Sequence, residues 1–114
     1  ENPLYLPQAK VYDASCALGP ALQLLEPASL HDLGVEITIE RARQPVFQGS
    51  TRTSNMNRKV EELVAYLYQE LSFPQGAFLL TGTGIVPPEQ FTLAHGDRVI
   101  ITVGELTLAN EIGA

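Results

Sequence analysis

Apolar and polar residues alternate between residues 35 and 41, and this period of two predicts a β-strand with one buried face. The apolar positions of the pattern, Val35, Ile37 and Ile39, are expected to face the core. Residues 44–48 follow after a short turn and are expected to return as the partner of this strand. The pattern therefore predicts a hairpin near the middle of the chain.

A different pattern follows, in which apolar residues recur every three or four positions from about residue 54 to residue 72. This spacing predicts the one long helix of the chain. Its apolar positions are Met56, Val60, Leu63, Val64, Leu67 and Leu71. The helix is expected to stop at Phe73-Pro74-Gln75-Gly76, because proline cannot continue a helix and glycine favours its end.

Shorter segments complete the predicted architecture. Strands are expected at residues 19–25, 77–80, 98–103 and 106–112, a helical turn capped by Ser29 at 28–33, and a polar link at 49–54. Residues 1–9 contain two prolines and no periodicity, so we expect an extended lead-in. Neither an internal repeat nor a linker is present, and residues 1–114 are therefore interpreted as one β-rich α+β domain.

The composition of the 114 residues is typical of a globular domain and excludes several classes of function. Apolar residues make up 45% and charged residues 18%. The formal net charge of −6 argues against a surface for nucleic acid or an anionic membrane. No apolar run approaches the roughly twenty residues that span a bilayer. A signal peptide is not expected from the opening residues. The single cysteine, Cys16, cannot form an internal disulfide, which favours a reducing compartment such as the cytoplasm.

Lys10 precedes a turn rich in small residues, and the next positive charge along the chain is Arg41. A nucleic-acid surface needs several cations together, so a single lysine points instead to a small anionic ligand. An isolated lysine is also a common solvated surface residue. Both interpretations of Lys10 stay open from its charge pattern alone.

A second candidate segment begins where the apolar run Leu79-Leu80 gives way to Thr81-Gly82-Thr83-Gly84. Glycine lets the backbone approach a ligand closely, and threonine offers a hydroxyl donor to a carboxylate or phosphate oxygen. Alternating threonine and glycine also occurs in ordinary loops. Thr83, with Gly82 and Gly84, is therefore a candidate anion-binding loop.

The other polar candidates are His31, His95, Cys16, Asp13, Asp97 and the pair Glu36 and Glu40. The two histidines lack a metal-ligand spacing and are expected in loops. Cys16 lacks an evident histidine partner and is expected to be a small buried residue. Asp13 is expected to pair with Lys10 or to cap its turn, and Asp97 to belong to a turn. The two glutamates are expected on the polar side of the strand at 35–41.

Five segments, in this order, resemble the fumarylacetoacetate hydrolase superfamily. They are the segment around Lys10, residues 49–58 (Gly-Ser-Thr-Arg-Thr-Ser-Asn-Met-Asn-Arg) with 61–67, residues 79–87, residues 93–99 (Leu-Ala-His-Gly-Asp-Arg-Val) and residues 107–112 (Thr-Leu-Ala-Asn-Glu-Ile). They cover nearly the whole chain. The opening residues 1–10 and the run Thr-Gly-Thr-Gly-Ile-Val-Pro are most similar to the branch that dehydrates 2-keto-3-deoxy sugar acids, such as 2-dehydro-3-deoxy-D-arabinonate.

The resemblance implies a mixed-sheet roll or barrel with one long helix, present here as a partial copy, the C-terminal portion of a catalytic domain. It implies a fragment of a dehydratase that works through a metal-stabilised enolate and uses Mg²⁺. The family's metal ligands, a Glu-x-Glu pair and an Asp, lie upstream of the lysine segment, where this chain has only Glu1. The Mg²⁺ ligands are therefore expected outside this chain, and the chain alone is expected to be inactive.

The resemblance also implies roles for single residues. Lys10 would lie beside the substrate oxyanion and could move protons. Thr83 would hold the substrate carboxylate, with Gly82 and Gly84 giving close backbone access.

The implied partners are a small-molecule 2-oxo acid and either a second copy of the chain, as a homodimer, or a complementary N-terminal half. Neither nucleic acid nor membrane is expected. Two alternatives stay open, namely a hydrolase or decarboxylase of a related 2-oxo acid and a non-catalytic binding or assembly module. Ala14 and Leu106 stand where relatives tend to carry glycine, which suggests relaxed backbone constraints.

Overall fold

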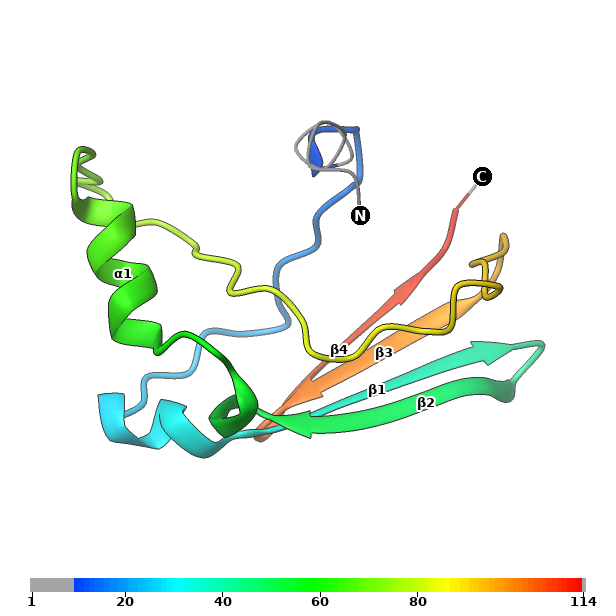
Figure 1. The fold of residues 1–114 in the computed structure, drawn as a ribbon. Helices are drawn as coiled ribbons and strands as arrows, with labels where there is room; N and C mark the ends of the chain where they lie inside the picture. Colours follow the sequence, from blue (N-terminus) through cyan, green and yellow to red (C-terminus); the bar gives the residue numbers. More distant parts are fainter. Residues whose placement is uncertain (1–9, 114) are drawn as a thin grey trace.

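Figure 1 shows the computed structural model, which describes residues 10–113. The strands are β1 (Gly34–Arg41), β2 (Gln44–Arg52), β3 (Arg98–Val103) and β4 (Leu106–Glu111). The helices are α1 (Val60–Tyr68) and two 3-10 helices, η2 (Pro27–Asp32) and η3 (Thr53–Asn55). Most of the regular structure is β, and the predicted β-rich fold class is confirmed. The lead-in expected at residues 1–9 lies outside the described residues.

The four strands form one sheet in the order β2-β1-β3-β4. Each neighbouring pair within residues 10–113 is antiparallel, so the parallel pairing that a mixed sheet implies does not occur in this part of the chain. β1 is an interior strand, and its Ile39 is only 2% exposed. Val35 and Ile37 are half-buried on the same strand, which confirms the predicted core face. α1 lies off one end of the sheet (Figure 1).

The β1–β2 hairpin, which the alternating pattern predicts, closes through two residues with a left-handed backbone. Arg41 pairs with Gln44, and between them Ala42 has a φ of 50° and Arg43 a φ of 64°. Positive φ at both central residues is the geometry of a type I′ turn, whose twist matches the flanking strands. The turn therefore fits the sheet but is occupied by residues with a Cβ atom, which makes this backbone unfavourable.

Replacing Ala42-Arg43 by Asn-Gly is expected to stabilise the protein by about 1 kcal/mol. Asparagine and glycine adopt a positive φ at lower cost than alanine and arginine. The free energy of unfolding in urea measures the gain. Arg43→Ala is the control, because it removes the guanidinium but keeps the Cβ. Equal stabilisation by Arg43→Ala would contradict the backbone explanation.

The helix predicted for residues 54–72 is wrong at both ends, since only Val60–Tyr68 is α-helical. The 3-10 helix η3 (Thr53–Asn55) occupies the beginning of the predicted helix. There the Thr53 hydroxyl accepts a hydrogen bond from the Leu33 N–H at 2.8 Å and donates one to the Leu30 carbonyl at 2.7 Å. These bonds hold the chain against η2, and serine and asparagine, which favour turns over helix interiors, occupy this stretch. The α-helix begins only beyond them.

Two of the predicted strands do not form within the described residues. Residues 19–25 and 77–80 are not part of the sheet. Leu24 is 90% exposed and Phe78 is 72% exposed, so neither segment is buried. A strand needs a neighbour for its backbone N–H and C=O groups, and the apolar composition of these segments does not supply one.

Two smaller predictions, the Ser29 cap and the polar link at residues 49–54, are wrong. η2 begins at Pro27 with Glu26 at the N-cap, so Ser29 lies inside the helix and does not cap it. The polar link expected at residues 49–54 is β2 as far as Arg52, because its residues pair with the first half of β1.

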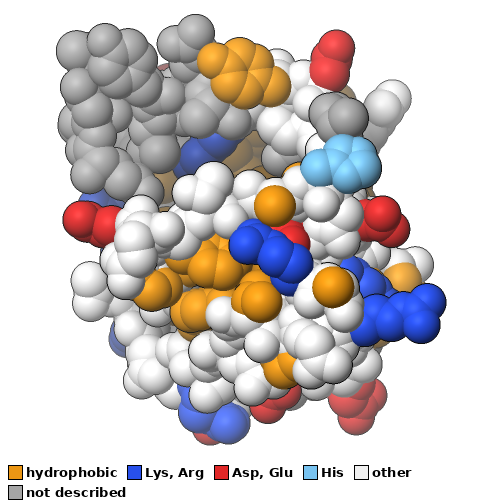
Figure 2. Space-filling model, turned by 90° about the vertical axis from the view of Figure 1, so that its right-hand side faces the viewer, with side chains coloured by type: hydrophobic (Ala, Val, Ile, Leu, Met, Phe, Trp, Pro, Cys, Tyr) orange, Lys and Arg blue, Asp and Glu red, His pale blue; other side chains and the backbone are white. Residues whose placement is uncertain are grey.

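An apolar groove of about 330 Å³ lies between the extended segment 19–25 and the strands β3 and β4. Its lining includes Leu22, Leu25, Ile101, Val103 and Leu106. Figure 2, which shows the face on the right of Figure 1, has apolar side chains gathered in its centre, a basic side chain directly beside them, and most of the other charged side chains at its margins. Within residues 10–113, no helix combines the length and the apolar character that crossing a membrane requires.

Candidate functional site

Lys10 stands at the start of an exposed turn, as the sequence predicts. The Ser15 N–H donates to the Tyr12 carbonyl at 3.1 Å, and the Ser15 hydroxyl donates to the Lys10 carbonyl at 3.2 Å. Ala14 has a φ of 57°, a conformation that glycine adopts without strain. This backbone explains why a glycine suits position 14. The turn is held by backbone and serine groups, and the Lys10 ammonium is exposed.

The loop that carries Thr83 has an internal bond at its centre. The Thr83 Oγ1 accepts from the Ile85 N–H and donates to the Ile85 carbonyl, both at 3.1 Å. Thr83 and its two glycine neighbours are exposed, whereas Ile85 is half-buried. The loop rests on β2, since a Cβ at Gly84 would lie 3.8 Å from the Thr51 Cγ2.

Gly82 and Gly84 differ in what the backbone demands of them. Gly82 has a φ of 87°, whereas no left-handed φ occurs at Gly84. We expect Gly82→Ala to destabilise the protein by about 1 kcal/mol and Gly84→Ala by less than about 0.5 kcal/mol. Urea unfolding measures both. Equal losses would contradict the assignment of the strain to Gly82.

The structure does not bring the two predicted segments together by any bond. Among the hydrogen bonds and ion pairs of residues 10–113, none joins Lys10 to Thr83. Asp13 also forms no ion pair with Lys10 in this part of the chain. A shared substrate cradle formed by Lys10 and Thr83 therefore stays a prediction.

Asp97, expected only to shape a turn, is also the buried partner of an arginine. Its side chain has no exposed surface. Arg41 donates from Nε to Oδ1 and from Nη2 to Oδ2, both at 2.8 Å, and the Ala94 N–H donates to Oδ2 at 2.8 Å. Arg41 also donates to the Thr92 carbonyl at 3.0 Å, and its guanidinium lies 6.0 Å from the centre of the Phe91 ring.

These bonds fix the charge of Asp97. The Arg41 guanidinium, and then the Ala94 N–H, lower the pKa of Asp97 from 3.8 to about 2. Asp97 is therefore an ionised structural anchor between the end of β1 and the turn before β3. Sequence reasoning missed the ion pair, because nothing in the local pattern of Arg41 or Asp97 marks the other as its partner.

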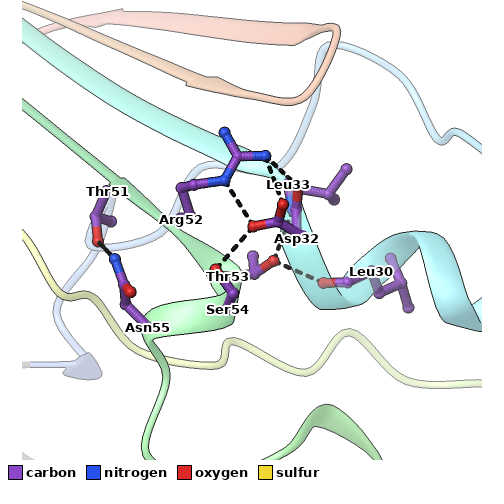
Figure 3. Close-up of polar contacts among 8 residues, drawn as sticks. All are labelled: Leu30, Asp32, Leu33, Thr51, Arg52, Thr53, Ser54 and Asn55. Atoms are coloured by element: carbon purple, nitrogen blue, oxygen red, sulfur yellow. Dashed lines mark hydrogen bonds and ion pairs between the residues drawn. The ribbon is translucent and has the colours of Figure 1, made fainter.

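A second polar cluster lies where β2 ends beside η2 (Figure 3). Arg52 donates from Nε to the Asp32 Oδ1 at 2.6 Å, from Nη2 to Oδ2 at 2.9 Å and from Nη2 to the Asp32 carbonyl at 2.7 Å. The Ser54 hydroxyl donates to Oδ1 at 2.7 Å. The bonds from Arg52 and then Ser54 lower the pKa of Asp32 from 3.8 to about 2. Both oxygens of the carboxylate are occupied, so this cluster joins η2 to β2.

The remaining candidates have structural roles or none. His31 lies in η2 rather than in a loop, and its Nε2 is 2.9 Å from the Glu61 Oε1 of α1. His95 lies in an exposed turn, as expected. Cys16 is exposed, so the expectation that it is buried is wrong, because no described element covers the extended segment around it.

The two glutamates of β1 behave as the polar side of a strand. Glu36 is exposed, and the half-buried Glu40 lies 3.7 Å from the Arg98 guanidinium of β3. Across the ladder, Glu40 pairs with Arg98 in the sheet register as well. The pair therefore supports the β1–β3 contact.

Residues 10–113 contain no group of three or more His, Cys, Asp or Glu side chains arranged to hold a metal ion. Magnesium requires near-octahedral oxygen coordination, to which proteins usually contribute carboxylates. The Asp32 and Asp97 carboxylates are each bound by an arginine. The described residues therefore do not fit a magnesium site on their own.

The family described as fumarylacetoacetate (FAA) hydrolase C-terminal matches residues 1–113. The chain belongs to this family. Among fumarylacetoacetate hydrolase relatives, a probable 2-keto-3-deoxyxylonate dehydratase of Haloferax volcanii is 45% identical over 114 residues. The 2-dehydro-3-deoxy-D-arabinonate dehydratase of Saccharolobus solfataricus is 40% identical over 107 residues. These alignments cover 98% and 93% of this chain, but only 39% and 36% of the two relatives.

Solved structures of the same fumarylacetoacetate hydrolase branch have this fold. A hexagonal crystal form of 2-keto-3-deoxyarabinonate dehydratase matches this chain with a TM-score of 0.89 at 38% identity. The match covers 96% of this chain and 38% of the dehydratase chain. 2-Keto-3-deoxy-D-arabinonate dehydratase complexed with magnesium and 2,5-dioxopentanoate has a TM-score of 0.88 at 38% identity, covering 98% and 41%. The predicted family, the similarity to its sugar acid dehydratase branch and the fold type are confirmed.

Proposed function

We propose that residues 1–114 are the C-terminal portion of the catalytic domain of a dehydratase that acts on 2-keto-3-deoxy sugar acids. The observation that carries the proposal is the TM-score of 0.88, at 38% identity, with the dehydratase that contains magnesium and 2,5-dioxopentanoate. The chain covers 41% of that structure. The activity is therefore proposed for the longer protein in which these residues occur.

In this proposal Lys10 is the catalytic residue. When a proton leaves carbon 3 of a 2-oxo acid, negative charge develops on the 2-oxo oxygen, and a nearby ammonium stabilises that charge. Two observations support this role. The turn at residues 12–15 is held without the Lys10 side chain, and Lys10 is an exposed residue.

Thr83 holds the substrate carboxylate in the same proposal. Its hydroxyl donates to the Ile85 carbonyl in this structure, so binding requires the proton to turn toward the carboxylate. The bond from the Ile85 N–H to Oγ1 can remain, and the loop keeps its shape. Gly82 and Gly84 leave the backbone on either side free of side chains, which allows the substrate to approach closely.

Magnesium, when bound, would act as a Lewis acid toward the 2-oxo acid. Its ligands are proposed outside the described residues, in a complementary N-terminal part of the protein. That part, or a second copy in a homodimer, is the proposed partner of the apolar groove beside β3 and β4. The proposed compartment is the cytoplasm, because the one cysteine, Cys16, is an exposed thiol.

An assay of the full-length protein tests the proposal. With Mg²⁺ and a 2-keto-3-deoxy pentonate, we expect formation of 2,5-dioxopentanoate, and chelation by EDTA should abolish it. The 114-residue chain alone should give little or no product, and Mg²⁺-dependent turnover by this chain would contradict the proposed place of the metal ligands. A full-length protein that dehydrates no 2-keto-3-deoxy pentonate would overturn the proposal.

Tautomerisation of oxaloacetate is the second candidate function. The observation that favours it is 34% identity over 102 residues with a mitochondrial oxaloacetate tautomerase of Homo sapiens, covering 85% of this chain and 31% of that protein. Oxaloacetate is also a 2-oxo acid, so Lys10 and Thr83 would serve the same groups. A panel with oxaloacetate and with hydrolysable or decarboxylatable 2-oxo acids separates these activities. Absence of turnover on the whole panel would favour a non-catalytic binding module.

A further inference from the structure

Gly49 occupies a position in β2 where a side chain has no room. A Cβ at Gly49 would lie 2.5 Å from the Ile85 Cγ2, 3.5 Å from the Phe47 Cζ and 3.6 Å from the Ile37 Cγ2. Non-bonded carbon atoms pack best at about 3.5–4.0 Å, so only the contact with Ile85 is far too short for alanine. The Ile85 side chain therefore fills the space that a side chain at position 49 would take.

Ile85 is also the residue to which the Thr83 hydroxyl is bonded. The Thr83 Oγ1 lies 3.1 Å from both the N and the O atom of Ile85. Ile85 is half-buried, while Thr83 and Gly84 are exposed. A shift of Ile85 away from β2 would thus move the Thr83 hydroxyl with it.

The segment after Thr83 lies along the same face of β2. Phe47, Gly49 and Thr51 alternate with exposed residues and form the half-buried face of the strand. Gly84 lies beside Thr51, and the Phe91 ring lies 6.0 Å from the Phe47 ring, centre to centre. Figure 1 shows this stretch, in yellow, running alongside the sheet. Gly49 therefore leaves a space between the side chains of Phe47 and Thr51, and the Ile85 side chain of the loop packs into this space.

We propose that Gly49 is a positioning residue for the substrate-binding loop. The absent side chain sets how closely Ile85 approaches β2, and through Ile85 it sets the position of the Thr83 hydroxyl. The inference rests on the role of Thr83 in the proposed function. Gly49 itself touches no substrate and acts only through Ile85.

The first test measures steady-state kinetics of Gly49→Ala in the full-length protein. We expect KM for the 2-keto-3-deoxy pentonate to rise by about ten-fold, while kcat stays within about two-fold, because carboxylate binding is weakened equally in the ground state and the transition state. Ser50→Ala on the opposite, exposed side of β2 is the matched control and should leave KM unchanged. A Gly49→Ala protein with the wild-type KM would overturn the inference.

Compensating variants identify the atom responsible. Adding Ile85→Leu to Gly49→Ala removes the Cγ2 methyl and is expected to return KM toward the wild-type value. Adding Ile85→Val keeps a methyl group at that position and is expected not to. Equal rescue by leucine and valine would contradict a contact through Cγ2.

A variant on the loop side keeps the test decisive if Gly49→Ala fails to fold. Ile85→Ala removes the anchor and creates no clash, so the loop loosens and KM is expected to rise by about ten-fold. Val86→Ala, at the adjacent residue that is 71% exposed, is its control and should leave KM unchanged. An unchanged KM in Ile85→Ala would overturn the inference.

The amide resonances of residues 82–84 separate this inference from the proposed function. They should shift in Gly49→Ala and return in the variant that also carries Ile85→Leu, whether or not the protein turns over a sugar acid. If the resonances shift in Gly49→Ala and return in the double variant, but the wild-type protein turns over no sugar acid, the dehydratase proposal alone is overturned. Unshifted resonances in Gly49→Ala would overturn the positioning role alone.

Discussion

Lys10→Met in the full-length protein is expected to lower kcat for dehydration by roughly 10²–10³-fold, the usual cost of removing one group that stabilises a developing oxyanion. Methionine keeps the unbranched shape and most of the length of the side chain and removes the ammonium. The Lys10 backbone carbonyl, and not its side chain, accepts the bond from Ser15 at 3.2 Å, so the turn should survive. Steady-state kinetics at saturating Mg²⁺ measures the loss, and an unchanged thermal midpoint shows that the fold is intact.

Lys59→Met is the matched control for Lys10→Met. Lys59 is the other lysine of the chain and is exposed at the N-cap of α1. Its replacement is expected to leave kcat within about two-fold, since a solvated lysine contributes little. If Lys10→Met also stays within about two-fold, Lys10 is a solvated surface residue and the catalytic proposal for it is wrong.

The sequence predicts the hairpin and the turns of this structure, because interactions between residues close in the chain determine them. The alternation at 35–41 requires only one buried face, and the hairpin with β2 follows from a short turn between two such segments. The turns around Lys10 and Thr83 are predicted for the same reason, because small residues and glycine mark turns. Glycine allows the positive φ at Gly82, whereas Ala14 adopts a positive φ in spite of its Cβ atom. The local turns of both candidate segments therefore follow from the sequence, while their role in a shared site stays a prediction.

The helix shows where local patterns stop being sufficient. The spacing of three and four continues to residue 71, yet α1 ends at Tyr68 and starts only at Val60. Its beginning is set by the bonds of Thr53 to Leu30 and Leu33, on a segment about twenty residues earlier in the chain. The hydrophobic pattern contains no information about those bonds.

A β-strand requires a neighbouring strand to satisfy its backbone hydrogen bonds, and the composition of a segment does not predict which strand that is. Residues 77–80 have the apolar run of a buried strand, but no ladder forms there within residues 10–113. A contact between Lys10 and Thr83 stays a prediction for the same reason, because it depends on the path of the chain between two exposed turns. The ion pair of Arg41 and Asp97 joins residues 56 positions apart, which only the folded arrangement of β1 and β3 brings together.

Asp97→Asn is expected to lower the thermal midpoint of unfolding by on the order of 10 °C, because changing the buried carboxylate of this ion pair leaves donors without an acceptor. Oδ1 accepts from Arg41, and Oδ2 accepts from both Arg41 and the Ala94 N–H. An asparagine must turn its NH₂ group toward one of these donors. Circular dichroism during heating measures the change.

The same carboxylate makes stability depend on acid in a defined direction. The pKa of Asp97 is about 2 in the folded protein, below the ordinary 3.8, so the unfolded chain takes up this proton first as the pH falls. The stability that Asp97 contributes is complete above about pH 4 and is lost as the pH falls toward about 2. Asp97→Asn should reduce the slope of stability against pH in that window.

Asp32→Asn is the matched comparison for Asp97→Asn. Asp32 also has a pKa of about 2 and also binds an arginine through both oxygens, but its side chain is 62% exposed. Solvent and salt screen an exposed pair, so we expect a much smaller loss of thermal midpoint than at Asp97. Each carboxylate is bound by one arginine through both oxygens, and the exposure of the two carboxylates differs from 0% at Asp97 to 62% at Asp32. Equal losses from the two variants would contradict burial as the reason for the larger effect.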